Sequence, residues 1–234
     1  MAAQEYDVIV IDADQILVAT GREPRTDDLG LESVGLKSGS WLEVNETMRV
    51  NGISGGWLYA VGDVNHRALL TYMGKYQARV CGEVICAQAR GPFNAGAAGE
   101  WSRLAASADH YAVPQVVFTD PEVAAVGLSA DQARERGLDV RVVDYDIGKV
   151  AGATLYADDY EGCARMVVDN ARNVLVGVTL VGPAVGEMLH AATIAVAGAV
   201  PIDRLRHAVP AFPTISEVWL RLLEALDAEL ICPT

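Results

Sequence analysis

The sequence has no long hydrophobic run, few cysteines and few basic residues, and each shortage excludes a class of protein. No apolar stretch reaches the roughly 20 residues that cross a bilayer, and residues 1–7 lack the basic segment that opens a signal peptide. We therefore expect no membrane partner and a cytoplasmic location. Four cysteines in 234 residues are too few for a disulfide framework, which fits a reducing compartment.

Basic residues are outnumbered by acidic ones, 18 against 31, and the net charge is −13. Such a surface repels nucleic acid and anionic membranes, so we expect neither as a partner. With 51% hydrophobic and 21% charged residues, the chain has enough apolar material for a folded core. Cys163 and Cys232 have no cysteine or histidine at metal-ligand spacing, so no metal site is expected.

The order of periodic segments predicts two domains joined near residues 91–110. Short strands are predicted over residues 8–11, 16–19 and 41–44, and the continuous apolar run 58–61 predicts a buried strand. A helical period follows over residues 68–89 and ends at Gly91-Pro92. Because residues 91–100 are typical of a linker, we assign residues 1–100 to one domain and 111–229 to another.

The second domain mixes strands with helices. Strands are predicted over residues 116–118, 123–126, 140–145, 165–169 and 174–180, and helices over 130–136, 186–197, 202–207 and 214–228. This order, with helices gathered toward the C-terminus, is typical of an α+β domain built on an antiparallel sheet.

Two tracts in the first domain end a strand abruptly on glycine and a polar residue. One is QILVATGREP, residues 15–24, and the other is WLYAVGD, residues 57–63. Glycine at a strand end lets a ligand approach the backbone, and the Asp63 carboxylate can accept a hydrogen bond from a sugar-alcohol hydroxyl. Taken alone, a Gly-Asp pair fits a simple strand-to-loop turn equally well.

Together these tracts resemble the flavin-binding segments of the pyridine nucleotide-disulfide oxidoreductases, the family of dihydrolipoamide dehydrogenase and mercuric reductase. Three later motifs are similar to the family's dimerisation domain: PQVVFTDPE at residues 114–122, LVGPAVGEM at 180–188 and AFPTISE at 211–217. The resemblance covers about residues 13–228. It implies an α/β plus α+β fold class, in which the remainder of a Rossmann-like FAD domain precedes an α+β dimerisation domain. It also implies FAD as cofactor, NAD(P)H as co-substrate and a homodimer formed through the C-terminal domain.

The resemblance also assigns the residues that would hold the cofactor. The two strand ends would contact the flavin, and the helix that begins near residue 70 would direct its first N–H groups at the pyrimidine edge. An ordinary amphipathic helix start is the alternative there. In the family, the backbone carbonyl at residue 212 reaches the flavin of the partner subunit, and the following X-Pro bond is cis. The implied set is Thr20, Gly21, Gly62, Asp63, Leu70, Thr71 and Phe212.

Phe212 stands where thiol-active members of the family carry the histidine that acts as general acid and base. A phenylalanine side chain cannot transfer a proton, so no catalytic residue is assigned and a dithiol substrate is not expected. A quinone or a metal ion needs no such proton shuttle. His207 lies five residues earlier and would point elsewhere. Glu217 would orient the histidine in the family; here it has no obvious partner, and we expect it as a carboxylate at a helix N-terminus.

Several parts that the family needs for catalysis are missing from the sequence. The strand at residues 6–11 should lead into a Gly-x-Gly-x-x-Gly turn for the FAD pyrophosphate, but Asp12-Ala13-Asp14 follows, and the fingerprint occurs nowhere. The NAD(P)-binding domain and the redox-active cysteine helix are missing too. We therefore expect the polypeptide to bind FAD weakly or not at all and to be inactive by itself. A non-catalytic dimerisation or interaction module is the alternative function.

Cys81 and Cys86 have the spacing of the family's redox pair but not its place. They lie in the predicted helix 68–89, where five residues rise about 7.5 Å and the two side chains diverge. A disulfide needs Cα atoms within about 7 Å and converging Cβ atoms, so we expect two buried thiols. Gly82 could break the helix, which keeps a thiol-redox protein as a third function.

Overall fold

The computed structural model describes residues 19–91 and 98–231, and the chain divides into two compact units, Met1–Trp41 and Leu42–Thr234. The strand predicted over residues 8–11, most of that over 16–19, the junction at 12–14 and Cys232 lie outside the described residues. The described part of the first unit is a loop around a short 3-10 helix, η1 (Leu31–Val34). Thr26 is buried there, and its hydroxyl donates to the Ser40 carbonyl at 2.8 Å.

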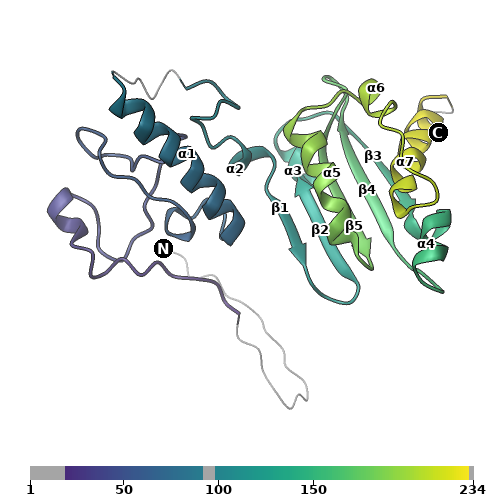
Figure 1. Cartoon of the computed structure of the whole chain (residues 1–234), viewed down its shortest axis with the longest axis horizontal. Helices are drawn as coiled ribbons and strands as arrows, with labels where there is room; N and C mark the ends of the chain where they lie inside the picture. The colour runs from purple at the N-terminus through teal and green to yellow at the C-terminus, as the bar shows by residue number, and fades with distance from the viewer. Residues whose placement is uncertain (1–18, 92–97, 232–234) are drawn as a thin grey trace, which may run out of the picture. The chain divides into compact units, whose positions relative to one another are not determined.

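The second unit begins with irregular chain, a 3-10 turn η2 (Asp63–Asn65) and the long helix α1 (Thr71–Ala89) (Figure 1). The helix agrees with the prediction for residues 68–89 to within three residues. The strands predicted at 41–44 and 58–61 are wrong, because each is reduced to a single bridge, Val44 with Val50 and Tyr59 with Arg49. A buried strand needs hydrogen-bonded neighbours and cover on its faces, whereas Val61 is 37% exposed.

A five-stranded sheet forms the centre of the remaining chain. Its order is β1-β2-β5-β4-β3, and every neighbouring pair is antiparallel. The central strand β5 is paired on both edges and buries seven of its nine residues, which explains its valine-rich sequence. The strands are β1 (Pro114–Val117), β2 (Glu122–Gly127), β3 (Val140–Asp146), β4 (Cys163–Asp169) and β5 (Val174–Gly182). All five predicted strands are confirmed within about two residues at each end.

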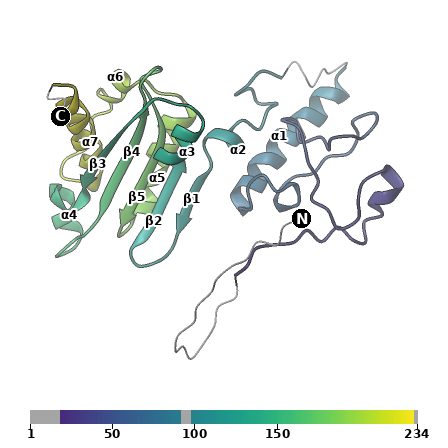
Figure 2. The same cartoon turned by 180° about the vertical axis from the view of Figure 1, so that it is seen from behind.

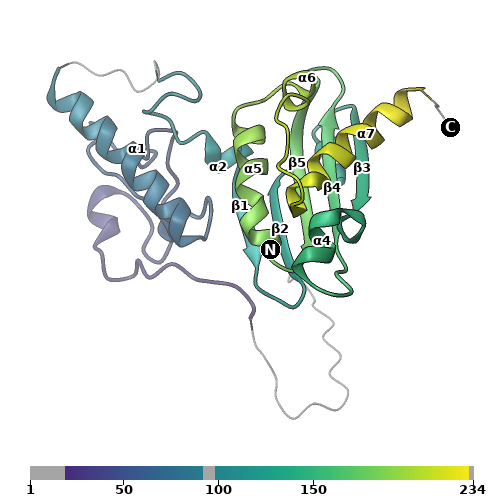
Figure 3. The same cartoon turned by 45° about the vertical axis from the view of Figure 1, so that its right-hand side comes forward.

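Helices cover the two faces of the sheet unequally. Helices α5 (Val185–Ala197) and α7 (Val218–Ile231) lie across one face and bury the main core against it (Figure 3). The short helix α3 (Ala130–Glu135) lies on the opposite face, where Ala133 packs against β4 and β5 (Figure 2). A capping box between Ser129 and Gln132 starts α3. The predicted α+β domain with an antiparallel sheet is confirmed.

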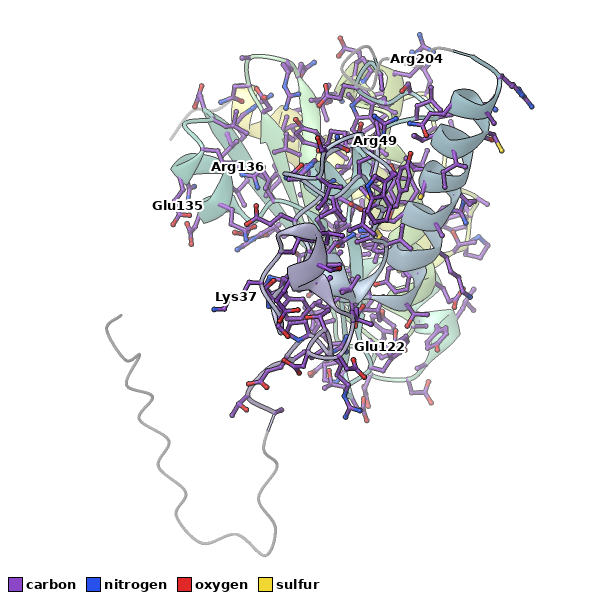
Figure 4. The ribbon with its side chains drawn as sticks, turned by 90° about the vertical axis from the view of Figure 1, so that its left-hand side faces the viewer. Lys37, Arg49, Glu122, Glu135, Arg136 and Arg204 are labelled. Atoms are coloured by element: carbon purple, nitrogen blue, oxygen red, sulfur yellow. The ribbon has the colours of Figure 1, made fainter. Side chains whose placement is uncertain are left out.

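Short elements complete the second unit: α2 (Ala108–Tyr111), η4 (Ile147–Lys149), α4 (Ala151–Tyr156), α6 (Ile202–Leu205) and η5 (Ile215–Glu217). The predicted helix 214–228 is divided into η5 and α7, and α2 and α4 were not predicted. Glu122 on β2 is labelled in Figure 4. Its carboxylate accepts a hydrogen bond from the Gly186 amide at the start of α5, at 3.0 Å. Over residues 19–91 and 98–231, every helix is too short or too polar to cross a membrane.

Candidate functional site

The Gly62-Asp63 pair forms a sharp turn at the end of the segment that precedes α1. Gly62 has φ 79° and ψ −157°, a conformation that is open to glycine and strained for other residues. Its amide donates to the side-chain oxygen of Gln77 at 2.7 Å. Asp63 opens η2 with an exposed side chain. The turn therefore presents the Asp63 carboxylate at the surface, while the hydrogen bond to Gln77 fixes the backbone at Gly62.

Helix α1 packs directly on this turn through a second glycine. A Cβ atom built on Gly74 would stand 3.1 Å from the Cα atom of Gly62, so the two backbones meet with no side chain between them. Gly74 is in the first turn of α1, and its amide donates to the Leu70 carbonyl at 3.1 Å. The structure therefore brings Gly62 beside the start of the helix at Leu70 and Thr71.

The N-terminus of α1 is open to a negatively charged group. Leu70 is extended, and the first amides with an intrahelical acceptor are those of Met73 and Gly74. The amides of Thr71 and Tyr72 therefore have no intrahelical partner. The first turn carries no acidic residue and no side-chain cap, so the positive end of the helix dipole is not neutralised locally.

Behind the turn lies a polar network that the sequence analysis missed. Gln77 is fully buried in α1; its oxygen accepts from the Gly62 amide and the Asn65 amide group, and its nitrogen donates to Asp109 at 2.9 Å. One signal was available: Gln77 lies on the same helix face as Met73 and Val80, so it is a polar residue in an apolar stripe. Burial raises the pKa of the Asp109 carboxyl, and the charge of Arg67 opposes that effect.

The network reaches the surface through Arg67. Its guanidinium donates to the Val44 carbonyl at 2.8 Å and to the Glu46 carboxylate at 3.0 Å, and it faces Asp109 at 3.5 Å. His110 also contacts Glu46, at 2.9 Å. Burial acts to raise the pKa of Glu46, but hydrogen bonds from His110 and Arg67 hold it below its ordinary value. Glu46 and Arg67, which precede α1, are thereby linked to Asp109 and His110 of α2.

Thr20 and Gly21 belong to the first unit. Both are exposed. Gly21 has φ 121°, in the region that favours glycine, and a Cβ atom there would meet nothing within 4 Å. The backbone at this predicted contact is therefore accessible and requires glycine for its conformation.

Phe212 lies in the segment between α6 and η5. Its side chain is 74% exposed, and its bond to Pro213 is cis, as the resemblance implied. The chain that follows packs on α4, where a Cβ atom at Gly152 would overlap the backbone of Thr214 and Ile215. Gly152 therefore allows this segment to lie against the body of the domain.

The expectation that Glu217 lacks a partner is wrong. Glu217 is buried, and its Oε1 accepts from Arg221 Nη2 at 2.6 Å and from Nε at 3.1 Å. The two residues are four apart at the start of α7, a spacing that places them on one helix face. The other carboxylate oxygen, Oε2, is buried and has no hydrogen-bond partner among the described residues.

The cysteines show no redox pair within the described residues. Helix α1 continues unbroken through Gly82, as expected. Cys81 and Cys86 both lie in it as free thiols. Only Cys81 is buried; the prediction of a buried side chain is wrong for Cys86, which is on the outer face of the helix. Cys163 is a free, exposed thiol on β4. No cluster of three potential metal ligands occurs over residues 19–91 and 98–231.

Comparison with known proteins identifies the family. The family model described as "Pyridine nucleotide-disulphide oxidoreductase" matches residues 2–91, and the model of that family's dimerisation domain matches residues 113–223. The dihydrolipoyl dehydrogenase of Thermus scotoductus is 34% identical over 232 residues, which cover 98% of this chain and 46% of that protein. The mercuric reductase of Staphylococcus aureus is 34% identical over 210 residues, 89% of this chain and 35% of that protein.

The fold is shared with solved structures. The HOCl-induced flavoprotein disulfide reductase RclA from Escherichia coli superposes with a TM-score of 0.68 at 24% identity, over 88% of this chain and 44% of that one. The chain thus spans less than half the length of the relatives it matches. Its two matched regions, the flavin-type segment and the antiparallel dimerisation domain, place it in one family. The chain belongs to the pyridine nucleotide-disulfide oxidoreductases.

Proposed function

We propose that this chain supplies part of an FAD-dependent NAD(P)H oxidoreductase that passes electrons through the flavin to a non-dithiol acceptor, a quinone or a metal ion. One observation carries the proposal: the Gly62-Asp63 turn packs against the open N-terminus of α1. That arrangement joins an exposed carboxylate to amides that favour a neighbouring negative charge.

The described residues fit one half of the cofactor. Asp63 would accept a hydrogen bond from a ribityl hydroxyl, and the start of α1 at Leu70 and Thr71 would face the pyrimidine edge. Thr71 would supply the amide donor there, because the Leu70 amide already donates to the Ala68 carbonyl at 2.8 Å. Gly62 leaves room at the backbone, because no side chain projects from it. FAD, when bound, supplies the redox chemistry. These residues contribute binding and an electrostatic environment that favours added negative charge.

The other half of the cofactor has no counterpart in the sequence. The glycine fingerprint that would hold the pyrophosphate is missing, so contacts to that group are lost. We expect weak FAD binding and no oxidoreductase activity from this polypeptide alone. We propose Thr20 and Gly21, in the first unit, as further flavin contacts. We also propose that the chain comprises two domains, residues 1–100 and 111–229.

The choice of acceptor rests on Phe212. Its side chain carries no titratable group, so proton transfer to a dithiol has no donor at this position. A homodimer through the sheet domain would place the Phe212 carbonyl against the partner's flavin, and the exposure of the side chain supports such a contact. We propose a cytoplasmic homodimer with neither nucleic acid nor a membrane as partner.

Flavin binding is tested by titrating the purified chain with FMN and with FAD while protein-induced fluorescence quenching is recorded. We expect weak binding of similar strength for both, because the adenylate half adds no contact. Asp63→Ala should weaken binding at least several-fold. Asp158→Ala, which removes an exposed carboxylate on the loop after α4, serves as the charge-matched control. A stoichiometric yellow chromophore after purification would refute the expectation of weak FAD binding.

The alternative is a non-catalytic dimerisation or interaction module, which the missing fingerprint favours. Neither function predicts turnover by this polypeptide alone, so the two are distinguished by flavin binding. Saturable FMN binding that Asp63→Ala weakens and Asp158→Ala leaves unchanged would support the oxidoreductase. Dimeric mass by light scattering, without flavin binding at millimolar FMN, would support the module.

A further inference from the structure

Gln77 has a hydrogen-bonding arrangement that its position in a helix does not require. The side chain is 0% exposed, and each end of its amide has a different kind of partner. The oxygen faces two donors, the Gly62 amide at 2.7 Å and Asn65 Nδ2 at 2.8 Å. The nitrogen faces one acceptor, Asp109 Oδ2, at 2.9 Å. Because donors and acceptors are arranged in this way, the amide can lie in only one orientation.

Asn65 closes the turn from the other side. Its Nδ2 also donates to the Ala60 carbonyl at 3.2 Å, and its Oδ1 accepts from the Arg67 amide at 3.1 Å. Asn65 thus joins Ala60, two residues before the Gly62-Asp63 pair, to Arg67, four residues after it, and Gln77 binds both Asn65 and Gly62. The turn is held by side chains as well as by its own backbone.

Asp109 sets the orientation of Gln77 at a cost in stability. Its side chain is completely buried, and its Oδ1 has no hydrogen-bond partner among the described residues. Nη1 of Arg67, 3.5 Å from Oδ2, is also buried without one. A buried ion pair with unsatisfied atoms usually adds little stability or reduces it. The pair is better explained by what it orients than by what it stabilises.

We propose that Gln77 and Asp109 are positioning residues that fix the Gly62-Asp63 turn for flavin contact. Asp109 accepts from the Gln77 nitrogen, which directs the Gln77 oxygen at the Gly62 amide. Asp109 lies in α2, outside both matched regions, 2–91 and 113–223, so neither family model covers it. The short segment between the two matched regions thereby acts on the flavin turn. The inference rests on the proposed function only in naming flavin as the ligand of the turn.

The first test measures the turn without any cofactor. Hydrogen exchange of the Gly62 amide, followed by NMR, reports the bond to Gln77 directly. Gln77→Met keeps the length of the side chain and removes the acceptor, so exchange at Gly62 should quicken about tenfold. Amides of β5 should be unchanged. Gln88→Met is the matched control, because Gln88 is on the same helix but contacts Tyr59 rather than the turn.

A double substitution that interchanges the amide of Gln77 and the carboxylate of Asp109 distinguishes a positioning role from a general effect on stability. Gln77→Glu alone places two carboxyl groups face to face and should quicken exchange at Gly62. In the double variant with Asp109→Asn, the asparagine can donate to the glutamate, and the direction of one hydrogen bond is reversed. Exchange at Gly62 should then return to within about threefold of the original chain. The double variant also covers the case in which Gln77→Met does not fold.

Flavin binding is the second measurement, with FMN as the probe. Gln77→Met and Gln77→Glu should weaken FMN binding at least fivefold, and the double variant should recover it. Unchanged exchange at Gly62 in Gln77→Met, or an equal increase in Gln88→Met, would overturn the positioning role. If exchange at Gly62 changes as expected but neither the original chain nor any variant binds FMN, the flavin function is overturned and the positioning of the turn remains.

Discussion

Gly62 and Gly74 meet backbone to backbone, with a Cβ at Gly74 only 3.1 Å from the Gly62 Cα. One glycine ends the segment that carries Asp63, and the other is in the first turn of α1. The neighbour of the added atom is main chain, which cannot move away as a flexible side chain can. The distance between the carboxylate turn and the helix N-terminus is therefore set by the absence of two side chains.

We expect Gly74→Ala to lower the free energy of unfolding by about 1–3 kcal/mol, because the added methyl group pushes α1 away from the turn. Gly82→Ala is the control in the same helix, where a Cβ atom meets nothing within 4 Å. There the better helix propensity of alanine should raise stability by about 0.5–1 kcal/mol. Urea unfolding of both variants checks the opposite signs. A stabilising Gly74→Ala would show that the contact is looser than described.

The sheet domain could be predicted from sequence, whereas the structure around the flavin turn could not. The strands of β2, β4 and β5 are specified locally by apolar and β-branched runs, so pattern alone finds them. Residues 58–61 have the same pattern but form one bridge, because a strand exists only with its neighbours and the described residues supply one. Motif spacing found Gly62 and Asp63, but it could not find the long-range contact between Gln77 and Asp109.

The ion pair of Glu217 and Arg221 provides a test at the start of α7. Arg221→Met should lower the urea midpoint, since it leaves the buried Glu217 carboxylate without a partner. Adding Glu217→Gln should restore about half or more of that loss, because the charge is then removed. Glu224→Gln, which removes only the exposed partner of Arg221, is the control and should change little. Equal losses for the Arg221 and Glu224 variants would contradict this account.

Arg165 and Asp144 form a bidentate pair across β3 and β4, with both distances 2.7 Å. Hydrogen bonds from Arg165 hold the pKa of Asp144 below its ordinary value. A carboxyl group whose pKa is lowered by folding stabilises the folded state above the pKa of the unfolded chain, and this contribution is lost as the pH falls through the folded-state value. Both side chains are about half exposed, so the contribution should stay below about 1 kcal/mol.

A double-mutant cycle with Arg165→Met and Asp144→Asn measures this coupling by urea unfolding. The coupling energy should be present at pH 7, fall with added salt and disappear as Asp144 is protonated in acid. A coupling energy that persists after acidification would show that packing of the two side chains, and not charge, joins them.

Thiol reactivity distinguishes the three described cysteines and tests the thiol-redox function. The thiolate is the reacting species, so a raised pKa slows alkylation at neutral pH. Burial raises the pKa of Cys81, and the side chain is enclosed in the folded chain. Burial, with a smaller effect of the Asp144 charge, raises the pKa of the exposed Cys163. We expect alkylation by iodoacetamide to be slow at Cys81 and faster at Cys86 and Cys163.

Peptide mass spectrometry of the alkylated chain, with and without prior reduction, assigns each site. Asp144→Asn should quicken alkylation of Cys163 by removing a negative charge, while Cys81 and Cys86 keep their rates. In urea the protection of Cys81 should vanish, since it depends on the packed face of α1. A disulfide between Cys81 and Cys86 in the unreduced sample would contradict the unbroken helix. In a continuous α-helix, two thiols five residues apart are too distant to bond and point in different directions.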